Sequence, residues 1–168
     1  MVISMYAASV PLFRQMLFSL AKVLEKGALF AEAGKIEPSA LLQSRLAPDM
    51  FPLVRQVQSA SDNVKGGVGR LAGVEIPRFA DNEASFADLH ERIARTLGFL
   101  DTVTPAQIDG SEDREITLRL GGRDMTFAGQ RYLFGFVMPN VIFHCTTAYD
   151  ILRHNGVELG KRDFIGTF

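Results

Sequence analysis

Two of the three histidines and the single cysteine of the chain lie close together in the sequence, at His144, Cys145 and His154. Imidazole is a common metal ligand and proton carrier, and a thiolate is a nucleophile. On a helix, however, successive residues point about 100° apart, so Cys145 does not share a face with His144. His154 would lie roughly 15 Å further along a straight helix, so these two histidines cannot hold one metal ion.

His144 is therefore the main candidate for chemistry, because it falls on the apolar face of its predicted helix, one turn after Asn140. A lone histidine there is more often a buried, hydrogen-bonded residue, and the alternative is a metal ligand. A metal site normally needs three protein ligands, and no histidine lies four positions from His144. Asp49, at the start of another predicted helix, could complement the helix dipole or reach the mouth of the bundle.

Composition excludes several classes of protein. The chain has 168 residues, is 47% hydrophobic and has a formal net charge of −1, which predicts one globular domain over 1–168 and no nucleic-acid partner. One cysteine cannot form an internal disulfide. The N-terminus has no basic leader and no long uncharged apolar run follows, so we expect no membrane span and a cytoplasmic location. No nucleophile-elbow serine, phosphate-binding glycine loop or paired-cysteine zinc motif indicates a reaction, and the catalytic residues stay unknown.

Apolar residues that recur every three or four positions predict four long helices, over 4–33, 49–71, 85–104 and 130–155. On the third helix the pattern places Arg92 and Arg95 on the solvent side. Pro139 predicts a kink or a new helix start within the fourth. The sequence therefore predicts an all-α protein, a four-helix bundle.

Three further features refine this prediction. Gly66, Gly67 and Gly69 either break the second helix or allow a close neighbour, and we favour the close neighbour. Residues 116–127 alternate apolar and polar around two glycines, which predicts a small β-hairpin between the third and fourth helices. Phe164 and Ile165 follow the last helix, and we expect them to dock the C-terminus on the bundle.

The chain also resembles a known family. The segments that carry the likeness are SMYAASVPLF, RLAPDMFPLVRQVQ and MPNVIFHCTTAYDILRHNGVELGKRDFIG, in this order. They are similar to the domain-of-unknown-function family numbered nineteen ninety-three, within the DinB/YfiT-like superfamily. The resemblance implies a DinB-like four-helix bundle and a homodimer. The superfamily also contains thiol-dependent transferases and metal-dependent hydrolases.

In metal-binding relatives, three histidines hold a divalent ion: one on the second helix and an H-x-x-x-H pair on the fourth. By resemblance, His144 matches the second histidine of that pair, Asn140 the first, and Asp49 lies closest to the position on the second helix. The resemblance thus implies an oxygen-rich set of His144, Asn140 and Asp49. Two hypotheses follow: a bundle protein with an altered, metal-free polar pocket, or a metal-dependent enzyme that uses a divalent ion.

Overall fold

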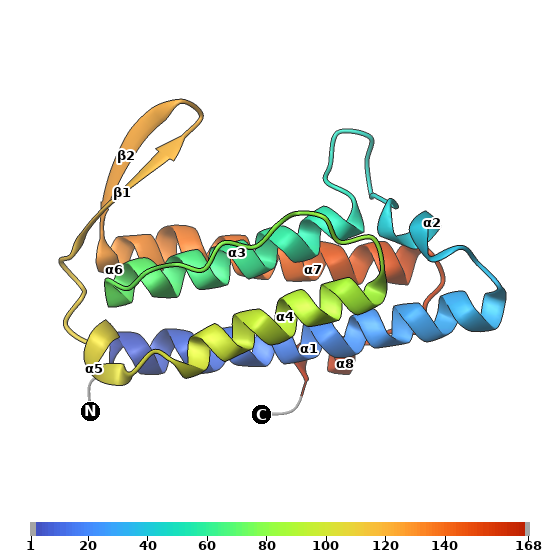
Figure 1. The fold of residues 1–168 in the computed structure, drawn as a ribbon, viewed down its shortest axis with the longest axis horizontal. Coiled ribbons are helices and arrows are strands. Elements are labelled where there is room, and N and C mark those ends of the chain that lie inside the picture. Colours follow the sequence, from blue (N-terminus) through green and yellow to red (C-terminus); the bar gives the residue numbers. More distant parts are fainter. Residues whose placement is uncertain (1–2, 167–168) are drawn as a thin grey trace.

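The computed structural model describes residues 3–166, and four long helices form its body (Figure 1). Both α7 and α4 pack on α1 and on α3, which makes a closed bundle around one apolar core. The predicted four-helix bundle with a small hairpin is confirmed. The long helices are α1 (Met5–Gly34), α3 (Leu53–Ala72), α4 (Phe86–Asp101) and α7 (Met138–His154), and the shorter elements are α2 (Pro38–Leu42), α5 (Pro105–Ile108), β1 (Glu115–Leu120), β2 (Arg123–Ala128), α6 (Gly129–Tyr132), the π-helical η1 (Leu133–Val137) and α8 (Lys161–Ile165).

Helix α3 begins at Leu53, so the prediction that placed Asp49 at its start was wrong. The cause is Pro52, because a residue that precedes proline, here Phe51, avoids helical geometry. The Leu53 N–H donates to the Ser44 carbonyl oxygen at 2.9 Å, which closes residues 44–52 into a loop. This loop projects from the bundle between α2 and α3 and carries Asp49 on its exposed surface (Figure 1).

The glycines of α3 permit a close neighbour, as predicted, and the helix runs through them without a break. A Cβ atom on Gly67 would lie 2.5 Å from Cγ1 of Val137, well inside van der Waals contact. Gly67 therefore allows α3 to approach the helical segment that leads into α7. This packing fixes the spacing between the two helices that carry the candidate site.

The segment before α7 is helical without interruption from Gly129, through α6 and η1. Proline has no N–H to donate to the carbonyl group one turn earlier, and a π-helical turn accommodates such a mismatch. Pro139 lies in the first turn of α7, directly after the π-helical turn, so the predicted irregularity is a change of helix type within one continuous helical segment. The π-helical turn η1 sets which side chains of α7 face α3.

Strands β1 and β2 pair antiparallel, with Leu120 opposite Arg123 across a two-residue turn. Gly121 and Gly122 have φ values of 57° and 80°, the left-handed geometry that such a tight turn requires. Ile116 and Leu118 are buried, which docks the otherwise marginal hairpin. The hairpin projects from the α6 end of the bundle (Figure 1).

Arg92 was predicted on the solvent side of α4, and that prediction was wrong. Its side chain is only 1% exposed and pairs with three carboxylates, at 2.7 Å from Asp62 and Glu83 and 3.1 Å from Asp81. Asp62 lies on α3, and the other two lie in the connection between α3 and α4. A charged residue can occupy an apolar face when its charge is paired, and hydrophobic periodicity does not report such pairing.

The C-terminal segment docks on the bundle, as predicted. The rings of Phe164 and Tyr149 meet edge to face with centroids 6.0 Å apart, and Gln15 Nε2 donates to the Ile165 carbonyl oxygen at 2.9 Å. Lys161 and Arg162 point to solvent. Helix α8 therefore covers part of α1 and α7.

Ending the chain at Leu159 is expected to lower the free energy of unfolding by roughly 1–2 kcal/mol, because a partly buried aromatic ring is lost. Thermal unfolding followed by circular dichroism would show a melting temperature several degrees lower. Lys161→Ala, which changes an exposed side chain of α8, is the matched control and should melt like the unmodified chain. An unchanged melting temperature after truncation would refute a stabilising role for the docked tail.

Candidate functional site

His144 is buried on the side of α7 that faces α3, and its ring contacts a second buried polar side chain. His144 Nδ1 lies 2.7 Å from Gln56 Oε1. The other end of that amide, Gln56 Nε2, donates to the Phe51 carbonyl oxygen at 3.0 Å. Because a carbonyl oxygen can only accept, the amide is oriented with Oε1 toward the ring. His144 Nδ1 must then be the donor, so Nδ1 carries the proton of the neutral imidazole.

The second ring nitrogen of His144, Nε2, is left as an acceptor. It has no hydrogen-bond partner among residues 3–166, and it is not one of their fully buried unpaired polar atoms. Burial lowers the pKa of His144 below its ordinary value, and the nearby positive charge of Arg55 lowers it further. The ring is therefore neutral at pH 7. A neutral imidazole with an available lone pair can accept a hydrogen bond, accept a proton or bind one metal ion.

One aromatic side chain and one cation lie near this ring. Phe143 meets His144 edge to face with centroids 5.4 Å apart. The Arg55 guanidinium lies 5.7 Å from the ring centroid of the exposed Phe51. The site is thus an imidazole at the edge of the bundle, between α7, the start of α3 and the loop 44–52.

Asn140 lies one turn before His144 on α7, as predicted, and is partly buried. Its amide nitrogen donates to the Phe136 carbonyl oxygen of the preceding turn at 2.7 Å, which leaves the amide oxygen for other partners. Asp49 lies in the exposed loop 44–52 and has no helix start to complement. Across residues 3–166, no group of three or more His, Cys, Asp or Glu side chains could hold a metal ion.

These residues do not fit a tightly held zinc or nickel ion. Such sites take three protein ligands, mostly nitrogen or sulfur, and this site offers one imidazole whose Nδ1 is already bonded to Gln56. The other donors are an amide oxygen and a carboxylate, which suit hard and more weakly held cations. The set of His144, Asn140 and Asp49 stays a prediction for an ion of that kind.

Gln56 is the site residue that the sequence reasoning missed. A signal for it exists in the spacing: Leu53, Gln56, Ala60 and Val64 follow one another at three and four positions, so Gln56 interrupts an otherwise apolar stripe. A polar residue within a buried stripe needs a partner. The resemblance to histidine-based sites implied Asp49 at this position instead.

Cys145 lies on a different side of α7 and takes no part in this site. It is buried beside Met16 and Tyr149, and burial raises the pKa of its thiol to about 12. Almost no thiolate exists at neutral pH, so Cys145 is a core residue, as expected. His154 is exposed at the end of α7.

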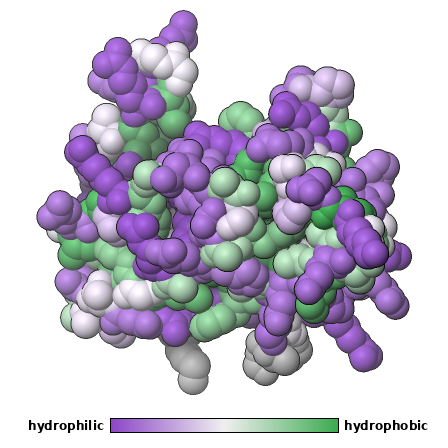
Figure 2. Space-filling view, turned by 45° about the vertical axis from the view of Figure 1, so that its right-hand side comes forward, coloured by the Kyte–Doolittle hydropathy of each residue, from purple (hydrophilic) through white to green (hydrophobic). Residues whose placement is uncertain are grey.

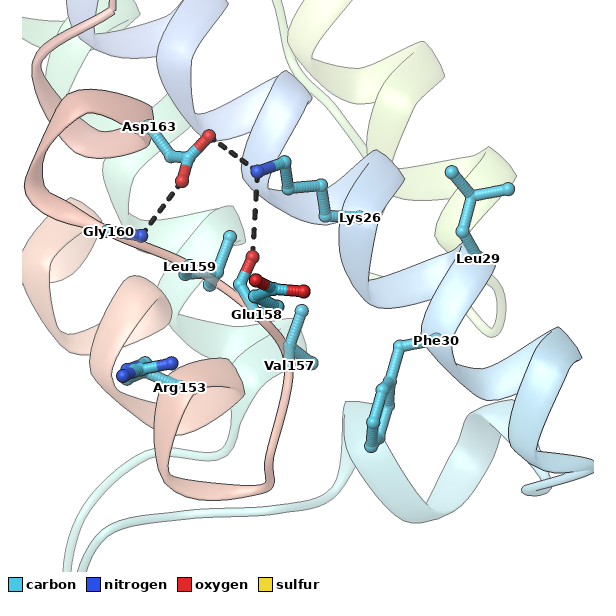
Figure 3. Close-up of a pocket in the computed structure, with 9 residues that line it drawn as sticks. All are labelled: Lys26, Leu29, Phe30, Arg153, Val157, Glu158, Leu159, Gly160 and Asp163. Carbon is cyan, nitrogen blue, oxygen red and sulfur yellow. Dashed lines mark hydrogen bonds and ion pairs between the residues drawn. The ribbon is translucent and has the colours of Figure 1, made fainter.

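A separate open groove of about 720 Å³ lies between α1, the end of α7 and the C-terminal segment (Figure 3). Its polar groups mostly satisfy one another: Lys26 Nζ lies 2.8 Å from Asp163 Oδ1 and 3.5 Å from the Glu158 carbonyl oxygen. Asp163 Oδ2 in turn accepts from the Gly160 N–H at 2.8 Å. These contacts fix the C-terminal segment against α1. The groove is lined by no residue of the His144 site.

Comparison with known proteins agrees with this architecture. The model of the family described as "Domain of unknown function (DUF1993)" matches residues 5–165. The chain belongs to the DUF1993 family. A solved structure described as a DinB family member protein from Shewanella denitrificans superposes on this DUF1993 chain with a TM-score of 0.91 and 40% sequence identity, over 97% of this chain and 92% of that one. No curated protein matches.

The predicted likeness and the DinB-like fold are thereby confirmed. Among residues 3–166, no helix of this DUF1993 protein has both the length and the apolar character that a membrane span requires.

Proposed function

We propose that this DUF1993 protein is a DinB-like bundle protein whose polar site presents His144 as a neutral imidazole and holds no transition metal tightly. The contact that supports the proposal is the 2.7 Å hydrogen bond between His144 Nδ1 and Gln56 Oε1. It occupies one ring nitrogen and makes the other an acceptor. Such a ring suits a small ligand that donates a hydrogen bond or a proton.

Elemental analysis of the purified protein tests this proposal. We expect zinc, nickel, iron and manganese well below one equivalent, with the same content in His144→Ala. Stoichiometric metal that disappears in His144→Ala would refute the proposal. Circular dichroism of both proteins shows whether the substitution keeps the fold.

A metal-dependent enzyme of the DinB-like superfamily, of the thiol-linked transferase or hydrolase type, is the second candidate. One observation favours it: His144 Nε2 and the Asn140 amide oxygen have no partner among the described residues and lie one turn apart on α7. His144, Asn140 and Asp49 would then hold a divalent ion weakly. An ion that binds only the folded state must stabilise it, so no rise in melting temperature with any divalent ion would refute this candidate.

Asn140→His should create the metal affinity that the natural chain lacks, because residues four apart share one face of a helix. At a hundredfold excess over the dissociation constant, zinc or nickel would raise the free energy of unfolding by about 2.7 kcal/mol. The melting temperature would rise by roughly 5–10 °C. The double variant Asn140→His with His144→Ala has one imidazole at this site and is the control. An equal response from the unmodified chain would contradict the altered-site proposal.

We also propose that the protein is a homodimer and works in the cytoplasm. Exposed apolar side chains on α7 support the dimer. The single cysteine, buried and without a disulfide partner, is compatible with a reducing compartment.

A further inference from the structure

The outward face of the helical segment from α6 to α7 exposes large apolar side chains. Phe134, Ile142 and Phe143 are each 44–54% exposed, and Met138 between them is partly buried. The opposite sides of α7 pack on α3 and α1, so these residues lie on the side without a helical neighbour. Contiguous apolar residues of this size on a surface usually mark an interaction site.

The charges along this segment have a regular arrangement. No Asp, Glu, Lys or Arg occurs from Tyr132 to Tyr149, whereas Arg131 precedes the stretch and Asp150 follows it. Neither of these two residues makes an ion pair within the part of the chain described by the structure. The uncharged surface therefore has one basic end and one acidic end.

This arrangement is self-complementary for two copies that run antiparallel. Arg131 and Asp150 lie at equal sequence distances from the midpoint between Asn140 and Val141. A two-fold axis through that midpoint brings each Arg131 opposite Asp150 of the partner subunit. It also brings Met138 opposite Phe143 of the partner subunit, so the apolar centres meet. A two-fold interface requires such a patch, which is complementary to itself.

Two projections flank the same helical segment. The hairpin contacts α6 at one end, and the loop 44–52 is tied to the other end through Ser44 Oγ, 3.1 Å from Asn155 Oδ1. Both stand above the body of the molecule, with a hollow between them (Figure 2). Each carries an exposed apolar side chain, Met125 on the hairpin and Phe51 on the loop. An antiparallel pairing places the hairpin end of one copy against the loop end of the other.

We infer that the outward face of α6, η1 and α7 is the homodimer surface, with two antiparallel copies joined by Arg131 and Asp150 at each end. This inference rests on the homodimer proposed above and names its surface. The occupant is a second copy because the charge pattern complements itself.

Sedimentation velocity across a dilution series of the full chain tests the surface. We expect a dimer, and we expect Arg131→Asp and Asp150→Arg each to raise its dissociation constant by roughly tenfold or more, because like charges then face each other at both ends. The double variant, with both changes, should recover the original constant. Glu91→Arg, on the exposed side of α4, is the control and should leave it unchanged. Thermal melts confirm that each variant is folded.

Three results would overturn parts of the inference separately. A monomer at every concentration would refute both the surface and the dimer. A dimer that ignores the two single changes would refute the surface alone. A double variant as weak as the single ones would refute the antiparallel pairing.

Discussion

Arg92→Met is expected to lower the free energy of unfolding by about 3 kcal/mol, because it removes the cation from a buried ion network. The guanidinium joins α4 to Asp62 of α3 and to Asp81 and Glu83 of the connecting segment. It also donates to the Ala80 carbonyl oxygen at 3.2 Å. Removing it leaves the Glu83 carboxylate, whose side chain is 7% exposed, without its cation.

The pKa of Glu83 shows that the network favours the charged state of this carboxyl group. Burial raises this pKa, but hydrogen bonds from Arg92 and Gln58 outweigh burial and hold it below the ordinary value. After Arg92→Met the Glu83 carboxylate keeps the hydrogen bond from Gln58, at 2.7 Å, but has lost the cation. We therefore expect the variant to melt at a temperature lower by roughly 6–12 °C, measured by calorimetry at pH 7.

Arg95→Met is the matched control on the same helix. Its guanidinium stacks over the Phe79 ring, with the central carbon 4.2 Å from the centroid, but makes no ion pair among the described residues. We expect less than about 1 kcal/mol from this change. If both substitutions lowered the melting temperature equally, the network would not be the source of the effect.

Gly129→Ala is expected to destabilise the fold by about 3 kcal/mol through overpacking. A Cβ atom at this position would overlap the backbone carbonyl oxygen of Ser111, which cannot move away like a flexible side chain. The next residue strengthens the constraint, because the Gln130 N–H donates to the Glu112 carbonyl oxygen at 2.8 Å. Gly129 is therefore where the chain before the hairpin crosses the start of α6.

Gly98→Ala provides a control of opposite sign. Gly98 lies inside α4, and its added Cβ would meet no atom within 4 Å apart from its chain neighbours and the nearby backbone of its own helix. Alanine is a better helix former than glycine, so stability should rise by about 0.5–1 kcal/mol. Chemical denaturation of both variants measures the two effects. A neutral Gly129→Ala would show that Ser111 does not constrain this position.

Local patterns in the sequence predicted most of the fold. Leu12, Met16 and Leu20 repeat with helical spacing, and Gly121–Gly122 predicts a tight turn, because each signal depends only on neighbours in the chain. The short helix α5 was not predicted, although Pro105 marks its first turn. Four residues are too few to show a helical period.

Contacts between distant residues could not be predicted in the same way. Gln56 and His144 are 88 positions apart, and Arg92 meets Asp62 across two helices. Neither pairing follows from a repeat of apolar residues. The resemblance implied a helical position for Asp49, but with Pro52 at its N-cap the helix begins only at Leu53.

The protonation of His144 tests the central claim most directly. In NMR spectra of the ¹⁵N-histidine-labelled protein, assigned by comparison with His144→Gln, we expect the proton on Nδ1 and a pKa below about 6.5, the ordinary value. The folded pKa is lowered below the unfolded value, so stability should fall as the pH drops from about 6.5 through the lowered pKa. A proton on Nε2, a pKa at or above the ordinary value, or the signature of a bound metal ion would contradict the account.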